Sequence, residues 1–299
     1  MLNKKLFNVS LLYYLPFIGL CLIGIIVGTF CDLNISSAIV NQNSAFGRFI
    51  ESFGMVVAYF LINASGVIVF KFLLNSKNKW LFVLANVYLI LTYIASAYYI
   101  HNGFVNSKEV NVTYGFAYSK VISYVIAFII SSIYTAISFF LIKKVDKDLL
   151  IIALIFVIAL ILQVLIINLL KKLNCRPRYR NMLGADYLPW YSFHPFSQSS
   201  DLYKSWPSGH TATATISLLF PLLFINHSKI KPFIIMIISY SYILLIAFYR
   251  VYYGAHFLSD VSFGGLISAL ICLLVIFIGN KISTSLKRKT NEVEFKESN

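Results

Sequence analysis

Long apolar segments alternate with short polar ones along the whole chain. Each is close to the roughly 20 residues that a helix needs to cross a hydrocarbon layer of about 30 Å. The pattern therefore predicts an all-α fold, a polytopic membrane helix bundle of about eight transmembrane helices. The eight segments are Leu11 to Cys31, Met55 to Leu74, Leu81 to Ile100, Val121 to Ile142, Leu149 to Leu170, Thr211 to Asn226, Pro232 to Tyr249 and Phe257 to Gly279.

Two of these segments need a separate interpretation. Thr211 to Asn226 is short for a full crossing, so we expect it to include part of the Pro207 to His210 turn or to lean on its neighbours. Lys4 and Lys5 precede the first segment, as in a cleaved signal peptide, but that segment is long and has no clear small-residue cleavage site. An uncleaved first helix is therefore favoured.

The composition also indicates a membrane protein. Hydrophobic residues make up 59% of the chain and charged residues only 12%, which is more apolar than a soluble domain of this length can bury. The four cysteines, Cys21, Cys31, Cys175 and Cys272, are scattered and mostly lie inside apolar segments. Their spacing predicts neither a disulfide framework nor a zinc site, and it leaves the redox compartment open.

The net charge of +14 follows the predicted membrane topology and does not require a nucleic-acid partner. Lysine and arginine cluster in every second polar segment. These segments all fall on one side of the membrane, which by the positive-inside rule is cytoplasmic. Both termini are then expected in the cytoplasm, with the chain in the cell (cytoplasmic) membrane. The basic residues on this side are Lys4, Lys5, Lys71, Lys77, Lys79, Lys143, Lys144, Lys147, Lys229, Lys231, Lys281, Lys287, Arg288 and Lys289.

The opposite side is poor in basic residues except for one cluster. Arg48, Lys108 and Lys120 are the isolated ones. A cluster of cations on this side predicts an anionic ligand, although nonspecific contact with lipid headgroups is an equal alternative on charge alone. The cluster consists of Lys171, Lys172, Arg176, Arg178, Arg180, Lys204 and Arg250.

Two sequence motifs before the sixth segment contain the residue types needed to hold a phosphoryl group. KKLNCRPRYR, residues 171–180, supplies Lys171 and Arg178, and basic side chains neutralise phosphoryl oxygens without a metal. WPSGHT, residues 206–211, predicts a tight turn at a helix start, which leaves backbone N–H groups for anionic oxygens. His210 ends this turn. A lone histidine there would more often be an interfacial polar residue, but here a PSG turn precedes it.

A third motif, YRVYYGAHFLSD, joins the seventh and eighth segments. His256 and Asp260 are four residues apart, so at the start of a helix they would lie on one face within hydrogen-bonding reach. The carboxylate would then fix the imidazole tautomer, which makes His256 a candidate nucleophile toward phosphorus. Half of a metal site would look similar, but no further ligand completes it and the nearby cations would repel a metal ion.

Together the three motifs resemble the signature of the type 2 phosphatidic acid phosphatase (PAP2) family. That pattern is Lys, six residues and Arg-Pro, then Pro-Ser-Gly-His, then Ser-Arg, five residues, His, three residues and Asp. This chain matches the order and spacings through Lys171 to Arg178, Pro207 to His210 and Arg250 to Asp260. Tyr179 replaces the proline and Tyr249 replaces the serine. The second replacement puts in doubt a hydrogen bond from the serine to phosphate.

The resemblance implies a membrane lipid phosphatase that needs no metal or other cofactor. In this reading His256 is the nucleophile that forms a phosphohistidine, Asp260 orients it, and His210 protonates the leaving oxygen and then activates water. The implied partners are a lipid phosphate and the bilayer, with no nucleic acid and no obligate protein partner. The charge topology places all three motifs at the extracytoplasmic face. The residues that would bind the phosphate are Lys171, Arg178, Ser208, Gly209 and Arg250.

The resemblance also divides the chain and limits the substrate. Residues 149–279 are the expected PAP2-like catalytic core, residues 1–148 hold N-terminal helices of which two are additional to the family core, and residues 280–299 are a polar cytoplasmic tail. The motifs read the phosphate and not the lipid tail. Phosphatidic acid, phosphatidylglycerol phosphate, a lipid A phosphate and a polyprenyl diphosphate all fit, and the outer location favours a carrier-lipid diphosphate such as undecaprenyl diphosphate, or another outer-leaflet substrate.

Three alternatives stay open. A lipid phosphotransferase would use the same intermediate with an acceptor other than water. A non-catalytic lipid-binding or transport protein would explain the helices and the basic cluster but not the spacing of histidine and aspartate. The related vanadium haloperoxidases share the phosphate pocket but are soluble. In addition, the aromatic-rich loop from Tyr187 to Trp206 is interpreted as a lid beside the site or as an interfacial anchor.

Overall fold

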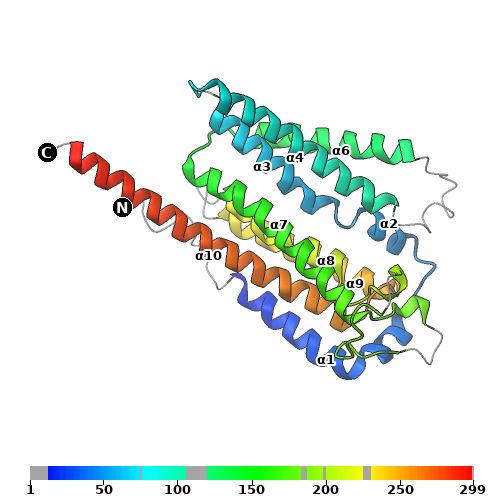
Figure 1. Ribbon diagram of the computed structural model, residues 1–299. Coiled ribbons are helices and arrows are strands. Elements are labelled where there is room, and N and C mark those ends of the chain that lie inside the picture. Colours follow the sequence, from blue (N-terminus) through cyan, green and yellow to red (C-terminus); the bar gives the residue numbers. More distant parts are fainter. Residues whose placement is uncertain are drawn as a thin grey trace.

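The computed structural model describes residues 13–74, 76–105, 120–182, 187–197, 200–224 and 230–297. Within these ranges the chain is all helical (Figure 1), so the predicted fold class is confirmed. The elements are α1 (Leu15–Ile39), α2 (Ala45–Phe53), α3 (Val56–Leu73), α4 (Lys79–Val105), α6 (Lys120–Leu141), α7 (Lys147–Asn174), η2 (Tyr179–Asn181), η3 (Asp201–Tyr203), α8 (Gly209–Thr215), η4 (Ile216–Phe224), α9 (Ile230–Tyr252) and α10 (Leu258–Glu297), where η marks 3-10 helix.

Seven helices of the described part are long and apolar enough to cross a membrane, with α2 and α3 counted as one. They coincide with seven of the eight predicted segments. The remaining segment, Thr211 to Asn226, falls on α8 and η4 and ends outside the described residues. Since its seven α-helical residues rise about 10 Å and its nine 3-10 residues about 18 Å, the stretched geometry brings it close to a full crossing.

The position of each helix in the bundle shows which surfaces suit lipid. The segments α3, α7 and α10 are the most buried, whereas α1, α4, α6 and α9 expose rows of apolar side chains. Phe30 on α1 is 80% exposed and Phe140 on α6 is 74% exposed, which is favourable in hydrocarbon but not in water. These helices indicate an integral membrane protein.

The order of crossings brings the loops that carry the motifs to one end of the bundle. The helices run side by side, and α1 begins and α10 ends toward the opposite end (Figure 1). In the described residues α3 packs against α4 and α7, while α1 packs against α10. Of the residues in the predicted charge pattern, Lys4, Lys5, Lys108 and Lys229 lie outside the described ranges.

Close contact between α10 and the PSG turn depends on Gly264. A β-carbon at this position would lie 2.4 Å from the carbonyl oxygen of Ser208 and 3.4 Å from the backbone nitrogen of Ala212. Both atoms belong to the backbone at the start of α8, so neither can rotate away. The third motif therefore reaches the second only because residue 264 has no side chain.

Gly264→Ala is expected to push α10 away from α8 and to destabilise the protein by about 1–3 kcal/mol, the usual cost of overpacking. Gly19→Ala is the matched control, because no heavy atom lies within 4 Å of a β-carbon there. It should leave stability unchanged or slightly raised. Thermal unfolding in detergent measures both changes, and equal midpoints for Gly264→Ala and the parent would contradict the packing argument.

Candidate active site

The segment after α7 is paired with the segment before α8. Helix α7 ends at Asn174 and is capped by Cys175, whose φ of 52° lies in the left-handed region and turns the chain across the end of the bundle. Beyond this turn the Ser205 amide donates to the Arg176 carbonyl at 3.0 Å, and the Arg178 amide donates to the Leu202 carbonyl at 2.9 Å. Backbone hydrogen bonds thus hold the first two motifs side by side.

The third motif joins the other two through the chain between α9 and α10. Gly254 adopts a φ of 67°, a conformation that glycine takes without strain, and its carbonyl accepts from the Arg180 amide at 2.8 Å. At the start of α10 the Asp260 carbonyl accepts from the Ser208 amide at 2.9 Å. All three motifs therefore meet at one end of the bundle.

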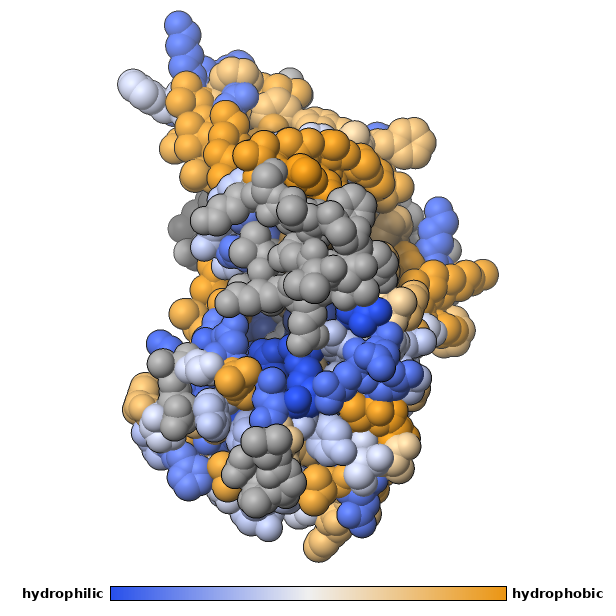
Figure 2. All heavy atoms as spheres, turned by 90° about the vertical axis from the view of Figure 1, so that its right-hand side faces the viewer, coloured by the Kyte–Doolittle hydropathy of each residue, from blue (hydrophilic) through white to orange (hydrophobic). Residues whose placement is uncertain are grey.

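A cavity of roughly 320 Å³ lies where the motifs meet. Figure 2 looks onto this end of the molecule and shows hydrophilic side chains gathered near its centre between apolar flanks. Among the described residues, no group of three His, Cys, Asp or Glu side chains is placed to hold a metal ion. Six of the eight predicted site residues line the cavity, namely Lys171, Arg178, Gly209, His210, Arg250 and His256.

The other two predicted residues, Ser208 and Asp260, support the site from behind. The Ser208 hydroxyl caps α8, since it accepts from the Thr211 amide at 3.4 Å and lies 3.1 Å from the Thr211 hydroxyl. It is not among the described residues that line the cavity. In both contacts the Ser208 oxygen accepts, so the hydroxyl caps the helix, and its own hydrogen bond to phosphate stays a prediction.

The expected hydrogen bond from His256 to Asp260 is not formed. Helix α10 begins only at Leu258, so His256 precedes it, and its Nδ1 lies 3.9 Å from Asp260 Oδ2. Nδ1 instead bonds the Ser205 carbonyl at 2.7 Å. The Ser205 hydroxyl in turn donates to Asp260 Oδ2 at 2.5 Å. Asp260 thus acts on His256 through Ser205, a residue that the motif spacing did not indicate.

A backbone carbonyl fixes the tautomer of His256. Because a carbonyl oxygen only accepts, Nδ1 carries the proton and Nε2 keeps its lone pair. Burial lowers the pKa of His256 well below its ordinary value, and Arg250 and Arg178 shift it in the same direction. The ring is therefore neutral at physiological pH, with Nε2 available as a nucleophile.

His210 is held in a similar way from the N-terminal half of the chain. Its Nε2 lies 2.9 Å from the backbone carbonyl of Glu51 on α2. This partner also only accepts, so Nε2 carries the proton and Nδ1 is the nitrogen left for proton transfer. Both histidines of the cavity are thus oriented by backbone carbonyls.

The basic side chains of the cavity are only partly paired with anions. In the described part of the chain Arg250 pairs with Glu51 at 3.3 Å and Lys204 with Asp201 at 2.6 Å, whereas Lys171 and Arg178 form no ion pair. Lys171, Arg178, Lys204 and Arg250 all line it, and the buried Nε atoms of Arg178 and Arg250 have no hydrogen-bond partner in the described part of the chain. A β-carbon at Gly209 would lie 3.2 Å from Lys171 Nζ, so this glycine leaves room for the lysine. Buried donors without acceptors are costly, and an anionic ligand would satisfy them.

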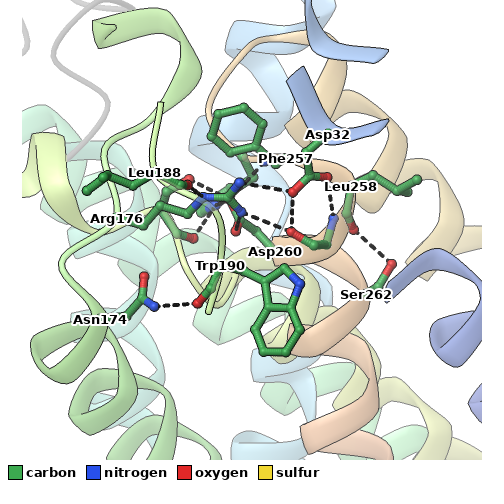
Figure 3. Close-up of polar contacts among 12 residues, drawn as sticks. Asp32, Asn174, Arg176, Leu188, Trp190, Phe257, Leu258, Asp260 and Ser262 are labelled. Carbon is green, nitrogen blue, oxygen red and sulfur yellow. Dashed lines mark hydrogen bonds and ion pairs between the residues drawn. The ribbon is translucent and has the colours of Figure 1, made fainter. Parts of the chain in front are cut away.

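Arg176 of the predicted basic cluster forms its ion pairs within the protein (Figure 3). It is fully buried, and its guanidinium bonds Asp32 Oδ2 at 3.0 Å, Asp260 Oδ1 at 2.6 Å and the Ser259 hydroxyl at 2.9 Å. The Ser259 amide also donates to Asp32 at 2.9 Å. One side chain therefore ties α1 to the start of α10 and fixes Asp260. The prediction of an anionic ligand for Arg176 is corrected, because its anions are two carboxylates of this chain.

The two tyrosines that replace family residues pack as ordinary aromatic side chains. The Tyr249 ring lies 4.6 Å from that of Phe46, and the Tyr179 ring meets Phe257 edge-on at 6.0 Å. Neither is among the described residues of the cavity wall. Tyr249 therefore does not take over the hydrogen bond of the missing serine.

The aromatic loop before α8 is docked onto the bundle. The Trp190 indole donates to the Thr29 hydroxyl at 2.9 Å and its ring lies 4.6 Å from that of Phe263. Tyr191 beside it is 57% exposed. No described residue from 187 to 197 lines the cavity, so the described part of the loop fits the role of an anchor better than that of a lid.

Asp32 and Glu51 are site residues that the motifs did not indicate. Asp32 is 1% exposed and Glu51 is 6% exposed. Each borders an apolar segment in the first half of the sequence, where an ionisable residue is costly without a partner. That cost is a usable signal, but the sequence does not say which cation each carboxylate would find.

Comparison with known proteins assigns the C-terminal part to a family. Residues 152–283 match the model of the PAP2 superfamily. This part of the chain is thus a PAP2 domain, as the motifs predicted, and the family suggests a phosphatase-type function. Neither the curated proteins nor the solved structures include a match to the chain.

Arg176→Met should leave Asp32 and Asp260 buried without a counter-ion, at a cost of about 3–5 kcal/mol. The double variant Asp32→Asn/Arg176→Met is expected to be less destabilised than the sum of the two single variants, because groups in one ion-pair network are coupled. Unfolding of the parent and the three variants in detergent measures this coupling. Strict additivity would show that the contact contributes nothing beyond its parts.

Proposed function

We propose that the protein is a metal-independent membrane lipid phosphatase that hydrolyses a phosphomonoester or diphosphate of a lipid through a phosphohistidine at the extracytoplasmic face. One observation carries the proposal: the rings of His256 and His210 share a cavity with basic side chains, and the buried Nε atoms of two of these, Arg178 and Arg250, have no hydrogen-bond partner among the described residues. The basic groups would hold a phosphoryl group, and the histidines would supply a nucleophile and a proton-transfer group.

The reaction has two steps, transfer of the phosphoryl group to His256 and hydrolysis of the phosphohistidine. Nε2 of His256 attacks phosphorus while the bond between phosphorus and the lipid oxygen breaks, and protonated His210 gives its Nδ1 proton to that oxygen. A bound phosphate favours this protonated form of His210. Water then attacks phosphorus and gives a proton to His210, and the P–N bond breaks to release inorganic phosphate and neutral His256.

Charge stabilisation falls to the basic side chains of the cavity. Lys171, Arg178 and Arg250 neutralise the three phosphoryl oxygens in the transition state, and the Gly209 N–H at the start of α8 adds a donor. Asp260, through Ser205, supports positive charge on the His256 ring. Substitution of any of the three cations should therefore lower kcat more than it raises KM.

The rest of the cavity wall favours a substrate with a lipid part. Besides the basic groups, the lining includes apolar and aromatic residues from α3 and its N-cap, α4 and α7, in a bundle whose outer surface suits hydrocarbon. A phosphate attached to an apolar chain would satisfy both parts of the wall. These residues are Met55, Tyr59, Tyr99, Val164 and Ile167.

The first test is release of inorganic phosphate by detergent-purified protein in EDTA, from phosphatidic acid, phosphatidylglycerol phosphate and a polyprenyl diphosphate. His256→Ala should lower the rate by about 10³-fold or more, because the nucleophile is lost. His194→Ala is the matched control, since this histidine is exposed and does not line the cavity. It should keep the parent rate.

Each outcome of that test has a clear reading. Release that survives EDTA and disappears only in His256→Ala supports the phosphatase. Product that forms only with an added alcohol or sugar acceptor would indicate a phosphotransferase. Absence of release from every lipid, or release unchanged in His256→Ala, would contradict the proposal in favour of a binding or transport protein.

The proposed orientation is tested with one introduced cysteine at a time in a Cys31→Ser background, in which the remaining native cysteines, Cys21, Cys175 and Cys272, are buried. Ser197→Cys, in the exposed loop near the site, should react in intact cells with a maleimide that does not cross membranes. Lys77→Cys, between α3 and α4, should react only after permeabilisation, because the positive-inside rule places it in the cytoplasm. The reverse labelling pattern would show that the topology is inverted and that the site lies at the cytoplasmic face.

A further inference from the structure

Glu51 brings a negative charge into a cavity that is otherwise built for an anion. It comes from α2, outside the residues that match the PAP2 superfamily, and it lines the cavity together with Arg250 and His210. Its carboxylate bonds the Arg180 guanidinium at 2.9 and 3.2 Å and that of Arg250 at 3.3 Å. The same Arg250 is proposed to hold a phosphoryl oxygen.

The sequence of α2 fixes the direction of Glu51. Ser44 caps the helix by accepting from the Gly47 amide at 3.0 Å. Phe46, Phe49 and Phe53 stack along one side of the helix, with ring centroids 5.7 and 4.7 Å apart. Gly47 lies against Tyr253, where a β-carbon would come within 2.8 Å of the ring. The helix is therefore seated closely on α9, and Glu51 is turned inward and 6% exposed.

The charges of the cavity wall suit a single phosphate group. The described lining residues include four basic side chains, Lys171, Arg178, Lys204 and Arg250, and two acidic ones, Glu51 and Asp201. Asp201 is 64% exposed and bonded to Lys204 at the rim, so Glu51 is the buried acidic group of the set. Its charge both occupies Arg250 and repels an incoming anion, and the repulsion grows with the charge of that anion.

We propose that Glu51 determines specificity as an internal counter-ion, which limits the positive charge of the cavity so that one phosphate group binds in preference to a diphosphate. The inference rests on the proposed function and narrows its substrate to lipid phosphomonoesters. It also gives the N-terminal half of the chain a direct part in the site.

The test measures binding without turnover, by calorimetry on the detergent-purified full chain, with inorganic phosphate and methylenediphosphonate as probes. The diphosphonate imitates a diphosphate and its P–C–P link is not hydrolysed. Glu51→Gln keeps the backbone carbonyl that holds His210 but removes the charge. It should lower the Kd for phosphate on the order of 10-fold and the Kd for the diphosphonate by a larger factor.

Two further variants keep the result interpretable. Arg180→Gln removes the guanidinium that neutralises Glu51 from outside the cavity, so it should weaken binding of both probes, the opposite of Glu51→Gln. Asp148→Asn is the matched control, because Asp148 bonds Ser283 away from the cavity. It should leave both Kd values unchanged.

Equal gains for the two probes in Glu51→Gln would overturn the selectivity, and unchanged or weaker binding would overturn the counter-ion role. The proposed role of Glu51 and the proposed phosphatase activity can be refuted separately. A protein that binds as expected but releases no phosphate from lipids would refute only the proposed function. If the protein releases phosphate from lipids, but Glu51→Gln has the same Kd as the parent for each probe, only the role of Glu51 is refuted.

Discussion

The geometry of the cavity depends on one buried guanidinium, that of Arg176. It bonds Asp32 of α1 and Asp260 of α10, and all three side chains are out of contact with solvent. A buried ion pair adds little net stability compared with apolar packing, but breaking it leaves uncompensated charge. The group therefore ties α1, the loop after α7 and the start of α10 together. In that arrangement the Ser205 hydroxyl donates to Asp260, and the Ser205 carbonyl bonds His256 Nδ1.

Around this group, backbone atoms do much of the work expected of side chains. The carbonyls of Ser205 and Glu51 bind the two histidines of the cavity, and Gly209, Gly254 and Gly264 allow the helices and turns to approach each other. A carbonyl fixes a tautomer without adding a charge, so a histidine can stay neutral among arginines. Arg178 and Arg250 each keep a buried Nε–H without a partner among the described residues, and an anionic ligand would accept from both.

The N-terminal half of the chain takes part in the site although it lies outside the family match at residues 152–283. Helices α3 and α4 supply part of the apolar cavity wall, α1 supplies Asp32, and α2 supplies Glu51. The cavity is therefore assembled from both halves of the chain. A domain cut to the matched residues would lose one wall of the cavity, the Asp32 partner of Arg176 and the Glu51 contacts of Arg180 and His210.

The sequence by itself determined the helical membrane fold, the family of the C-terminal part and six residues of the cavity, because hydrophobic length and motif spacing are local properties of the chain. It did not determine which carboxylate meets which cation. Asp32 and Arg176 are 144 residues apart and Glu51 and Arg250 are 199 apart, so their pairing depends on how the helices pack. It also misplaced the partner of His256, since the four-residue spacing to Asp260 implies a hydrogen bond only inside a helix, and α10 begins two residues after His256. Only the tertiary structure decided that a carbonyl from another loop would fill that place.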